Sequence, residues 1–351
     1  MTSISELTRE IKERARQLGF PLCGVTTPDP PAHLDFFRKW LEAGFEASMD
    51  WISSVRSLER RADPKSVLPD CRSILVLASP YPAPRGNLKG GNIAAYALNQ
   101  DYHEVLTKRL QQLVDFIEEQ AGEPVPNRWY TDTGPILEKE LAMRAGLGWI
   151  GKNTVLINRD FGSYFFLAEI LLGLDLEIDS PSPETFCGTC TRCLDTCPTG
   201  ALREPYTLDA NRCISYLTIE HREEIPEKLR PRMGDWVFGC DICQVVCPWN
   251  KPGKEAEDIL EEFQPRQELV DLDLIKELGL SQEEFSSRFR GSPVKRTKRR
   301  GYLRNVAIAL GNCGEEGTVP VLEEALKDDE PLVREAAEWA LIRIRSVQDN
   351  I

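Results

Sequence analysis

The stretch that decides the architecture reads Cys187-Gly-Thr-Cys190-Thr-Arg-Cys193-Leu-Asp-Thr-Cys197-Pro198, and part of it returns as Cys240-Asp-Ile-Cys243-Gln-Val-Val-Cys247-Pro248. The second run repeats the last three cysteine positions of the first. Val237 stands where its first cysteine would be, and Cys213 is the only other cysteine nearby. Eight cysteines therefore fall into two sets of four, with Cys213 completing the second set.

This spacing is typical of proteins that hold a pair of 4Fe–4S cubanes. Three cysteines of one run bind one cluster, and the fourth binds the other. A tight loop can wrap three corners of a cube, and the fourth cysteine then lies on a helix that points the other way. The first cluster is thereby assigned Cys187, Cys190, Cys193 and Cys247. The second cluster is assigned Cys197, Cys213, Cys240 and Cys243.

Zinc is the alternative metal, because C-x-x-C pairs also make zinc sites. A zinc ribbon needs two such pairs and would leave Cys193, Cys197, Cys213 and Cys247 without a role. The two C-x-x-x-C-P endings are also not typical of zinc sites. We therefore interpret the segment as a ferredoxin-like relay of single electrons.

The composition places this relay in a large acidic chain. The sequence has 351 residues, a net charge of −13 and 11 cysteines. Three of the cysteines, Cys23, Cys71 and Cys313, lie outside the cysteine-rich segment 187–247. Disulfide scaffolds of secreted proteins are small and spread their cysteines, so metal ligation in a reducing compartment is favoured. The charged N-terminus has no apolar signal region, and no run approaches the ~18 apolar residues of a membrane span. We expect a cytoplasmic monomer.

Residues 1–180 alternate helical and β-rich patterns. Ser73–Ser79 and Ser163–Leu172 are predicted strands, and His103–Gln120 is an amphipathic helix. Thr133–Ala145 is also predicted to be helical. This alternation predicts an α/β domain with a layered sheet and flanking helices. The cluster domain is then expected at 181–255, and a basic segment with C-terminal helices at 256–351.

The C-terminal part contains a repeat. Leu303-Arg304 with Ala307 and Leu310 recurs as Val333-Arg334 with Ala337 and Ala340. Such units cannot bury their apolar faces alone, which favours HEAT-like helices that lean on the rest of the protein. Two unrelated amphipathic helices are the alternative.

A local basic segment interrupts the acidic chain. Between Arg288 and Arg304 there are eight basic residues and no acidic one. The dense part consists of Lys295, Arg296, Lys298, Arg299 and Arg300. Such a patch favours contact with nucleic-acid phosphates, and the alternative is a solvated loop.

Five further motifs are specific enough to indicate a family. They are Tyr130-Thr-Asp-Thr-Gly-Pro135, Arg144-Ala-Gly-Leu-Gly-Trp-Ile-Gly-Lys-Asn153, Phe161-Gly-Ser-Tyr164, Arg212-Cys-Ile-Ser215 and Gly239-Cys-Asp-Ile-Cys-Gln244. With the eight cysteines, they resemble the epoxyqueuosine reductase (QueG) family over nearly the full length. The resemblance implies a nitroreductase-like α/β cobalamin domain, a ferredoxin-like two-cluster domain and HEAT-like helices.

The resemblance also implies a reaction. The family reduces epoxyqueuosine to queuosine at the wobble position of tRNA, the last step of queuosine biosynthesis, with two electrons and two protons taken up and water released. An external one-electron reductant would feed the clusters, and the clusters would feed base-off cobalamin. The basic segment Lys295–Arg300 would then meet tRNA phosphates.

Asp132 is the catalytic acid that the resemblance implies, because an epoxide oxygen leaving as alkoxide needs a proton. The alternative is a helix N-cap in front of Pro135, which would instead lower the pKa of the carboxyl. Cobalamin contacts carried over from the family are Arg61, Asp132, Lys152, Asn153, Ser163, Ser215 and Asp241. Without the family, Lys152 would be a solvated turn residue and Arg61 a surface charge.

Two other sequence patterns give weaker evidence of function. Gly146, Gly148 and Gly151 match a dinucleotide fingerprint but lie after a helix and before a strand, the wrong order. Asp101-Tyr-His103 approaches a cobalt-ligating D-x-H motif without its glycine, so we interpret Asp101 as an N-cap. A reductive dehalogenase-like enzyme and a non-catalytic electron carrier remain the alternative functions.

Overall fold

The computed structural model describes residues 3–83, 91–182, 185–250 and 259–348. An antiparallel sheet of four strands lies in the N-terminal part, with the strand order β1-β2-β7-β4. Its strands are β1 (Leu22–Thr26), β2 (Ser73–Pro80), β4 (Asn127–Tyr130) and β7 (Phe165–Leu172). The two strands predicted at Ser73–Ser79 and Ser163–Leu172 are therefore confirmed as the centre of this sheet.

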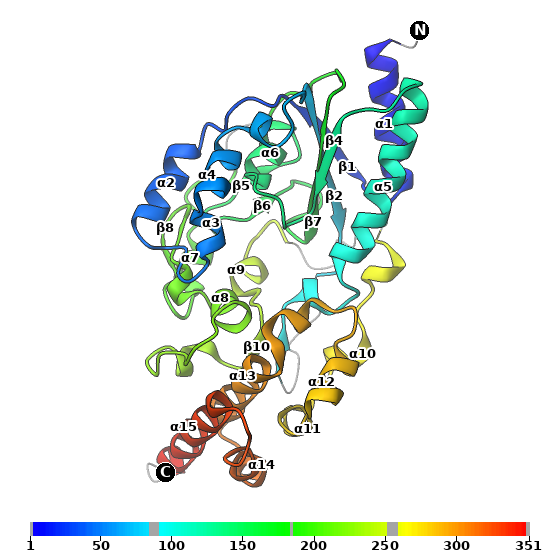
Figure 1. The fold of residues 1–351 in the computed structure, drawn as a ribbon. Helices are drawn as coiled ribbons and strands as arrows, with labels where there is room; N and C mark the ends of the chain where they lie inside the picture. Colours follow the sequence, from blue (N-terminus) through cyan, green and yellow to red (C-terminus); the bar gives the residue numbers. More distant parts are fainter. Residues whose placement is uncertain (1–2, 84–90, 183–184, 251–258, 349–351) are drawn as a thin grey trace.

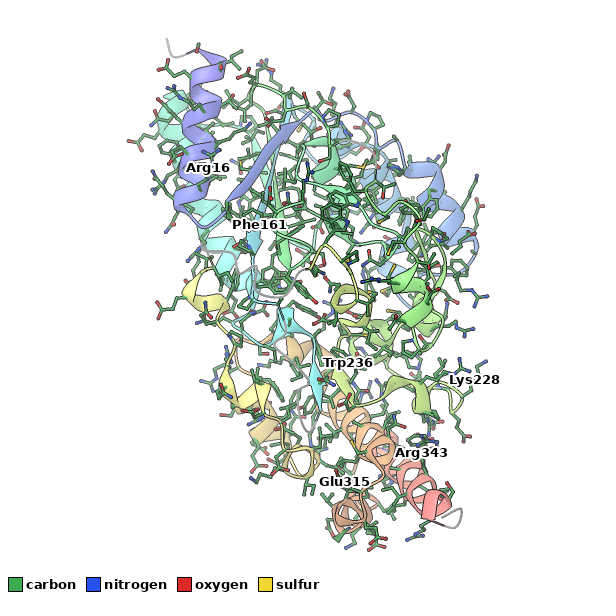
Figure 2. The ribbon with its side chains drawn as sticks, turned by 180° about the vertical axis from the view of Figure 1, so that it is seen from behind. Arg16, Phe161, Lys228, Trp236, Glu315 and Arg343 are labelled. Atoms are coloured by element: carbon green, nitrogen blue, oxygen red, sulfur yellow. The ribbon has the colours of Figure 1, made fainter. Side chains whose placement is uncertain are left out.

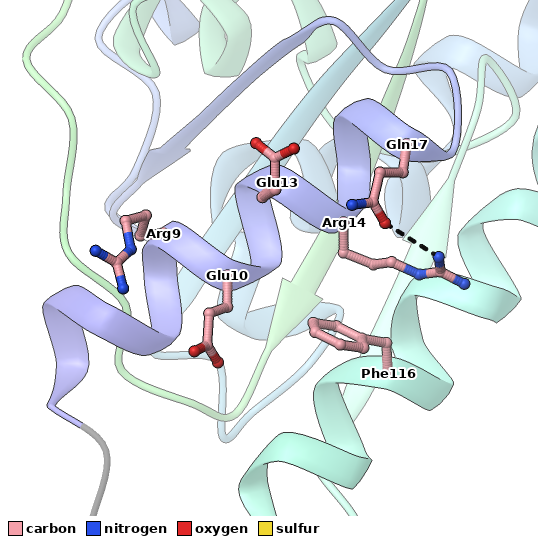
Figure 3. Close-up of a pocket in the computed structure, with 6 residues that line it drawn as sticks. All are labelled: Arg9, Glu10, Glu13, Arg14, Gln17 and Phe116. Atoms are coloured by element: carbon pink, nitrogen blue, oxygen red, sulfur yellow. Dashed lines mark hydrogen bonds between the residues drawn. The ribbon is translucent and has the colours of Figure 1, made fainter.

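Helices cover both faces of the sheet (Figure 1). On one face, α1 (Ile4–Gln17) and α5 (Tyr102–Ala121) pack their apolar residues against alternate positions of β7. On the other face, α6 (Glu138–Arg144) packs against the intervening positions. The layered α/β arrangement is the predicted one. A hollow on the outer side, between α1 and α5, is lined by Arg9, Glu10, Glu13, Arg14, Gln17 and Phe116 (Figure 3).

Smaller elements complete this part of the chain. They are α2 (Leu34–Glu42), α3 (Asp50–Ser53), α4 (Val55–Ala62), β3 (Asn92–Ile93) and the hairpin of β5 (Trp149–Ile150) with β6 (Leu156–Ile157). Helix α5 begins after Asp101, whose carboxylate accepts a hydrogen bond of 3.0 Å from the His103 backbone N–H. The predicted N-cap role of Asp101 is confirmed.

The cysteine segment consists of short elements around the two runs. They are α7 (Arg192–Thr196), β8 (Leu202–Glu204), β9 (Thr207–Leu208), α8 (Ile214–Ile219), β10 (Trp236–Phe238) and α9 (Ile242–Val245). Helix α7 packs against α9, which brings the two runs together. Strand β10 pairs in parallel with β3, so the segment is attached directly to the N-terminal part.

The C-terminal part is helical. Its helices are α10 (Gln267–Val270), α11 (Leu274–Leu278), α12 (Gln282–Arg288), α13 (Lys298–Cys313), α14 (Val319–Ala325) and α15 (Pro331–Gln348). The two repeat units lie on α13 and α15, which pack so closely that a Cβ on Gly311 would stand 2.8 Å from Ala340 Cα. Figure 2 labels Arg16 of α1 and Arg343 of α15 at opposite ends of the molecule.

One hydrophobic core joins the C-terminal helices to the cysteine segment. It contains Leu217 and Val237 from the segment together with Leu303 and Ala337 from the repeat. The predicted leaning of the repeat on the rest of the protein is confirmed. The boundary predicted at 255 lies outside the described residues. Among the described helices, none is long and apolar enough to cross a membrane.

Arg304 holds this shared core together. Its side chain is 0 % exposed. Its Nη1 atom donates to the carbonyl oxygens of His221 (2.9 Å) and Glu223 (2.6 Å), and Nη2 donates to that of Leu217 (2.7 Å). A single guanidinium therefore satisfies one carbonyl in the last turn of α8 and two in the loop after it.

Replacing Arg304 by Met should destabilise the protein by about 3–5 kcal/mol, because one buried and two partly buried carbonyls lose their donor and each such loss costs up to about 1–3 kcal/mol. Urea unfolding followed by circular dichroism measures the change. Arg345→Met on exposed α15 surface is the matched control and should stay within about 0.5 kcal/mol of wild type. Equal stability of both variants would contradict the role of Arg304.

Candidate active site and electron-relay segment

All eight cysteines of the relay segment are free thiols. Burial raises the pKa of the Cys193 thiol, and the neighbouring Cys187 and Cys247 raise it further. Burial likewise raises the pKa of Cys240, with added contributions from Cys213 and Cys243. The thiols thus influence one another chiefly within the two sets that the spacing predicts. Cys243 stands at the junction, since Cys193 of the other set also raises its pKa.

The donor sets fit two cubanes better than isolated ions. Within the described ranges, no three His, Cys, Asp or Glu side chains form a group that could hold a single metal ion. The four cysteines of a cubane each bind a different iron atom and need not converge on one point. In the second set, the backbone N–H groups of Ser215 and Tyr216 face the Cys213 sulfur.

Three predicted cobalamin contacts bond to the relay segment instead. Lys152 Nζ donates to the carbonyl oxygens of Gly188 (2.6 Å) and Cys190 (3.0 Å). Asn153 Nδ2 donates to the carbonyl of Cys243 (3.4 Å). Ser163 Oγ donates to Gln244 Oε1 (2.9 Å). These side chains fix the cluster loops to the α/β part, and their contact with cobalamin stays a prediction.

Asp132 does not cap a helix, so that alternative is wrong. Helix α6 begins at Glu138 with Leu137 as its N-cap, not at Thr133 as predicted. The helix begins later than predicted because Pro135 disfavours helical backbone in the residue before it. Gly134 makes the turn possible, because a Cβ there would lie 2.6 Å from the Tyr130 ring.

The backbone holds Asp132 in a conformation that few residues adopt. Its φ is +60°, in the left-handed region. Its side chain is 59 % exposed. Residues held in this way cluster at functional sites, and here the strain presents a carboxylate outward from the end of β4.

His103 lies between two carboxylates. Its Nδ1 is 2.7 Å from Asp101 Oδ1, and its Nε2 is 3.5 Å from Asp132 Oδ2. Burial opposes the charge on the ring, but the two carboxylates outweigh burial and raise the pKa of His103 to about 9. Burial also opposes ionisation of Asp132, but His103, Tyr102 and Arg296 hold the pKa of Asp132 below its usual range. At neutral pH the proton therefore sits on His103 and Asp132 is ionised.

The pH dependence of this ion pair follows from the direction in which the pKa of His103 is shifted. The pKa of His103 is raised from 6.5 to about 9, so the pair stabilises the fold fully below pH 6.5. That contribution is lost as the pH rises through about 9. The sequence offered a signal for this histidine in Asp101-Tyr-His103, but it indicated a cobalt ligand that lacked its glycine.

Charged groups from three distant segments act on Tyr96. Burial raises the pKa of the Tyr96 phenol well above its usual range, and the charges of Asp132 and Asp241 raise it further while Arg296 lowers it. Asp241, beside Cys240, is 2 % exposed and accepts a hydrogen bond of 2.7 Å from the Ala95 N–H. The predicted acid, the relay segment and the basic segment therefore all have charged or polar groups near Tyr96.

The basic segment is helical and not a loop. It spans a 3₁₀ turn (Pro293–Thr297) and the start of α13. Lys295, Arg296 and Lys298 are exposed. Arg299 instead pairs with both carboxylate oxygens of Asp328 (3.1 and 2.5 Å) and donates to the Leu280 carbonyl. Arg300 is half-buried.

Arg296 also has partners within the protein. It forms an ion pair with Glu220. Its guanidinium lies 5.8 Å from the ring centroid of Trp51, an exposed aromatic side chain on α3. An exposed ring beside an arginine is a surface on which a base can stack.

The remaining predicted contacts lie at the edge of this site. Arg61 contacts Ser57 Oγ and lies 5.9 Å from the Phe37 ring centroid. Burial lowers the pKa of Arg61, and Glu138 opposes that effect. The Ser215 side chain makes no hydrogen bond within the described part of the chain and is half-buried.

These features define an iron–sulfur oxidoreductase of the double-cluster type. Residues 186–250 match the model of the 4Fe-4S double cluster binding domain, and residues 298–349 match HEAT repeats. Residues 61–133 match the model "Epoxyqueuosine reductase QueG, DUF1730". The chain belongs to the epoxyqueuosine reductase family.

Relatives and solved structures agree on this family. The epoxyqueuosine reductase of Pseudomonas aeruginosa is 42% identical, with 97% of this chain and 95% of the relative covered. That of Escherichia coli is 39% identical over 96% of this chain and 89% of the relative. A crystal structure of epoxyqueuosine reductase with an epoxyqueuosine-modified tRNA-Tyr stem loop matches with a TM-score of 0.89 at 33% identity, covering 97% of this chain and 91% of that one. The reductive dehalogenase and electron-carrier alternatives are set aside.

Proposed function

We propose that the chain is a cytoplasmic enzyme that reduces epoxyqueuosine in tRNA to queuosine, using two 4Fe–4S clusters, cobalamin and an external one-electron reductant. The observation that carries the proposal is that the charges of Asp132, Asp241 and Arg296, from three distant segments of the chain, all act on the Tyr96 phenol. This supports a site at which a proton donor, an electron relay and an RNA-binding segment would act together. A related enzyme solved with a modified tRNA stem loop supports the choice of substrate.

Each cluster would be held by the four cysteines assigned to it. Lys152 and Asn153 keep both runs at a fixed position against the α/β part through their bonds to the carbonyls of Gly188, Cys190 and Cys243. Fixed ligands limit the reorganisation that accompanies each electron transfer. The relay would thus deliver single electrons next to Asp241.

Cobalamin, when bound, would supply a cobalt centre that passes electrons to the epoxide carbon. All three histidines of the chain have other partners: His33 contacts Glu140, His103 lies between two aspartates, and His221 contacts the Glu224 carbonyl. Base-off cobalamin is the form that the resemblance to the family implies, and no histidine of the chain is proposed to hold it. Arg61, Asp132 and Ser215 would hold its amide groups, with Lys152, Asn153, Ser163 and Asp241 supporting them.

Asp132 would deliver protons to the epoxide oxygen. That oxygen leaves as water and needs two protons in each turnover, whereas Asp132 is ionised at neutral pH and must receive each proton from a neighbouring group. Asp132 must therefore be reloaded during the reaction. His103 at 3.5 Å is charged at neutral pH and can supply a proton directly.

The exposed basic residues give a test of tRNA binding. Replacing Lys295, Arg296 and Lys298 together by Ala should weaken tRNA affinity and reduce the slope of log K against log salt by about 2, since each lost phosphate contact removes roughly 0.7–0.9 from that slope. A titration between low and moderate salt measures it. Lys276→Ala with Lys327→Ala removes exposed lysines elsewhere and should leave the slope unchanged. An unaltered slope in the triple variant would place the tRNA site elsewhere.

The reaction itself is tested on modified tRNA. Anaerobically purified protein is mixed with cobalamin, a chemical one-electron reductant and tRNA that contains epoxyqueuosine. Mass spectrometry of the digested nucleosides should then show loss of one oxygen atom and appearance of queuosine. Protein that holds both clusters and binds the tRNA, yet leaves epoxyqueuosine intact, would disprove the proposal.

A further inference from the structure

Two carboxyl groups near Asp132 have oxygen atoms that no hydrogen-bond donor among the described residues reaches: Glu169 is fully buried, and Glu138 is half-buried with its Oε1 atom shielded from solvent. Glu169 belongs to β7 and is 0 % exposed, and Glu138 is the first residue of α6. Glu169 shares its face of the sheet with Leu167 and Leu171, in the apolar cluster under α6. A glutamate at the centre of a sheet is costly unless a partner satisfies it.

The partner of Glu169 is another acid. In the described part of the chain, no conventional donor reaches either carboxyl oxygen of Glu169 or the Oε1 atom of Glu138. The two carboxyl groups instead lie within hydrogen-bonding reach of each other. A hydrogen bond between two carboxyl groups exists only when at least one of them carries a proton. The pair therefore stores a proton inside the sheet.

The surroundings keep that proton in place. Burial raises the pKa values of both groups, and the charge of Asp132 raises them further. Among opposing groups, the Asp132 backbone N–H and Lys139 favour ionisation of Glu138. The other titratable neighbours are Arg61 on α4, Tyr102 on α5 and Tyr130, which stands opposite Glu169 on β4.

We propose that Glu138 and Glu169 form a proton store that reloads Asp132 within each turnover. The inference rests on the proposed function, in which one oxygen atom must receive two protons. His103 reaches Asp132 from one side, and the acid pair lies on the α6 side, where the backbone N–H of Asp132 faces Glu138. His103 on one side and the acid pair on the other would each supply Asp132 with one of the two protons.

The step balances without any redox change. An O–H bond of the pair breaks, and an O–H bond forms on the Asp132 carboxylate. Both carboxyl groups carry a proton before the transfer, because burial raises the pKa of each. The negative charge then moves from Asp132 to the pair, where the one remaining proton is shared between the two carboxyl groups. Solvent restores the missing proton after product release. The electrons for cleavage of the carbon–oxygen bond come separately, from the external reductant through the clusters.

The test uses Glu169→Gln and Glu138→Gln in the full-length protein loaded with clusters and cobalamin. Each variant should lower the single-turnover rate of epoxyqueuosine reduction by about tenfold or more, because general acid catalysis is typically worth 10²–10⁴-fold. The pH profile distinguishes this from a packing defect. Wild type should keep a rate that is independent of pH until the pair ionises, whereas the variants should lose rate steadily as pH rises, because solvent must supply the proton.

Glu140→Gln is the matched control. Glu140 is a buried carboxylate two residues further along α6, but it accepts hydrogen bonds from the backbone N–H groups of Ala32 and His33 (2.5 and 3.1 Å). Its variant should keep the wild-type rate and pH profile. Wild-type rates and profiles in both Glu169→Gln and Glu138→Gln would overturn the proposal.

Infrared spectroscopy tests the store without the reaction. Wild-type protein should show the carbonyl stretch of a buried protonated carboxyl group at neutral pH, and Glu169→Gln should lose it while Glu140→Gln keeps it. Absence of this band from wild type would overturn the proposal. If wild-type protein shows the band but converts no epoxyqueuosine, the proposed function fails while the proton store stands.

Discussion

Replacing Asp132 by Asn is expected to lower epoxyqueuosine reduction by about 10²–10⁴-fold while tRNA affinity stays within about twofold of wild type. Asparagine has nearly the same shape as aspartate but carries no transferable proton. It also tolerates the left-handed backbone that Asp132 adopts at φ +60°, so the loop should keep its conformation. The loss would therefore report on chemistry and not on folding. Single-turnover conversion followed by nucleoside analysis measures it.

The same variant makes a second, independent prediction. His103 owes part of its raised pKa to Asp132, so Asp132→Asn should lower the pKa of His103 from about 9. The change can be followed by NMR of the ring protons. Asp175→Asn, which alters an exposed carboxylate paired with Arg72 (2.9 Å), is the control and should change neither activity nor the histidine. Activity of Asp132→Asn within a few-fold of wild type would remove Asp132 from the mechanism.

Replacing Cys213 by Ala is expected to cost the second cluster and with it all epoxyqueuosine reduction. Iron content should fall from about eight atoms per chain to about four or fewer, since Cys213 is the assigned fourth ligand. The backbone N–H groups of Ser215 and Tyr216 already face its sulfur, as expected for a thiolate ligand. Iron analysis and low-temperature electron paramagnetic resonance of the reduced protein measure the loss.

Cys313→Ala is the matched control for this variant. Cys313 is an exposed free thiol at the end of α13, outside the relay segment. Its variant should keep full iron content and activity. Full iron content in Cys213→Ala would show that the second cluster has another fourth ligand. The residue that replaces the cysteine missing from the pattern at Val237 would then have to be identified again.

The sequence predicted the parts of the protein that depend on local pattern. The strand at Ser73–Ser79 is a β-rich run, and the eight cysteines follow a spacing that only a few ligand geometries use. The start of α6 was predicted too early because Asp132 and Pro135 together match an N-cap pattern. Backbone strain at Asp132 is set by the surrounding structure, so the pattern could not reveal it.

The missed features depend on contacts between distant residues. In the sequence Arg299 is one more cation of the basic segment, but in the fold it pairs with Asp328, which lies in the connection between α14 and α15. Glu169 did leave a trace, since it interrupts the apolar run of β7. That trace could not indicate a proton store, because the other half of the pair comes from α6.

The shared core of the relay segment and the C-terminal helices decides whether the helices can be removed or exchanged as a unit. Thr218, five residues after Cys213, accepts hydrogen bonds through its carbonyl from Thr297 (3.1 Å) and Asn305 (2.9 Å) in the basic segment and α13. Cutting the chain before the helices would strip the apolar side of the relay and leave it prone to aggregate. The C-terminal helices are therefore part of the same folded unit as the cysteine segment and not a module that can be detached or exchanged by itself.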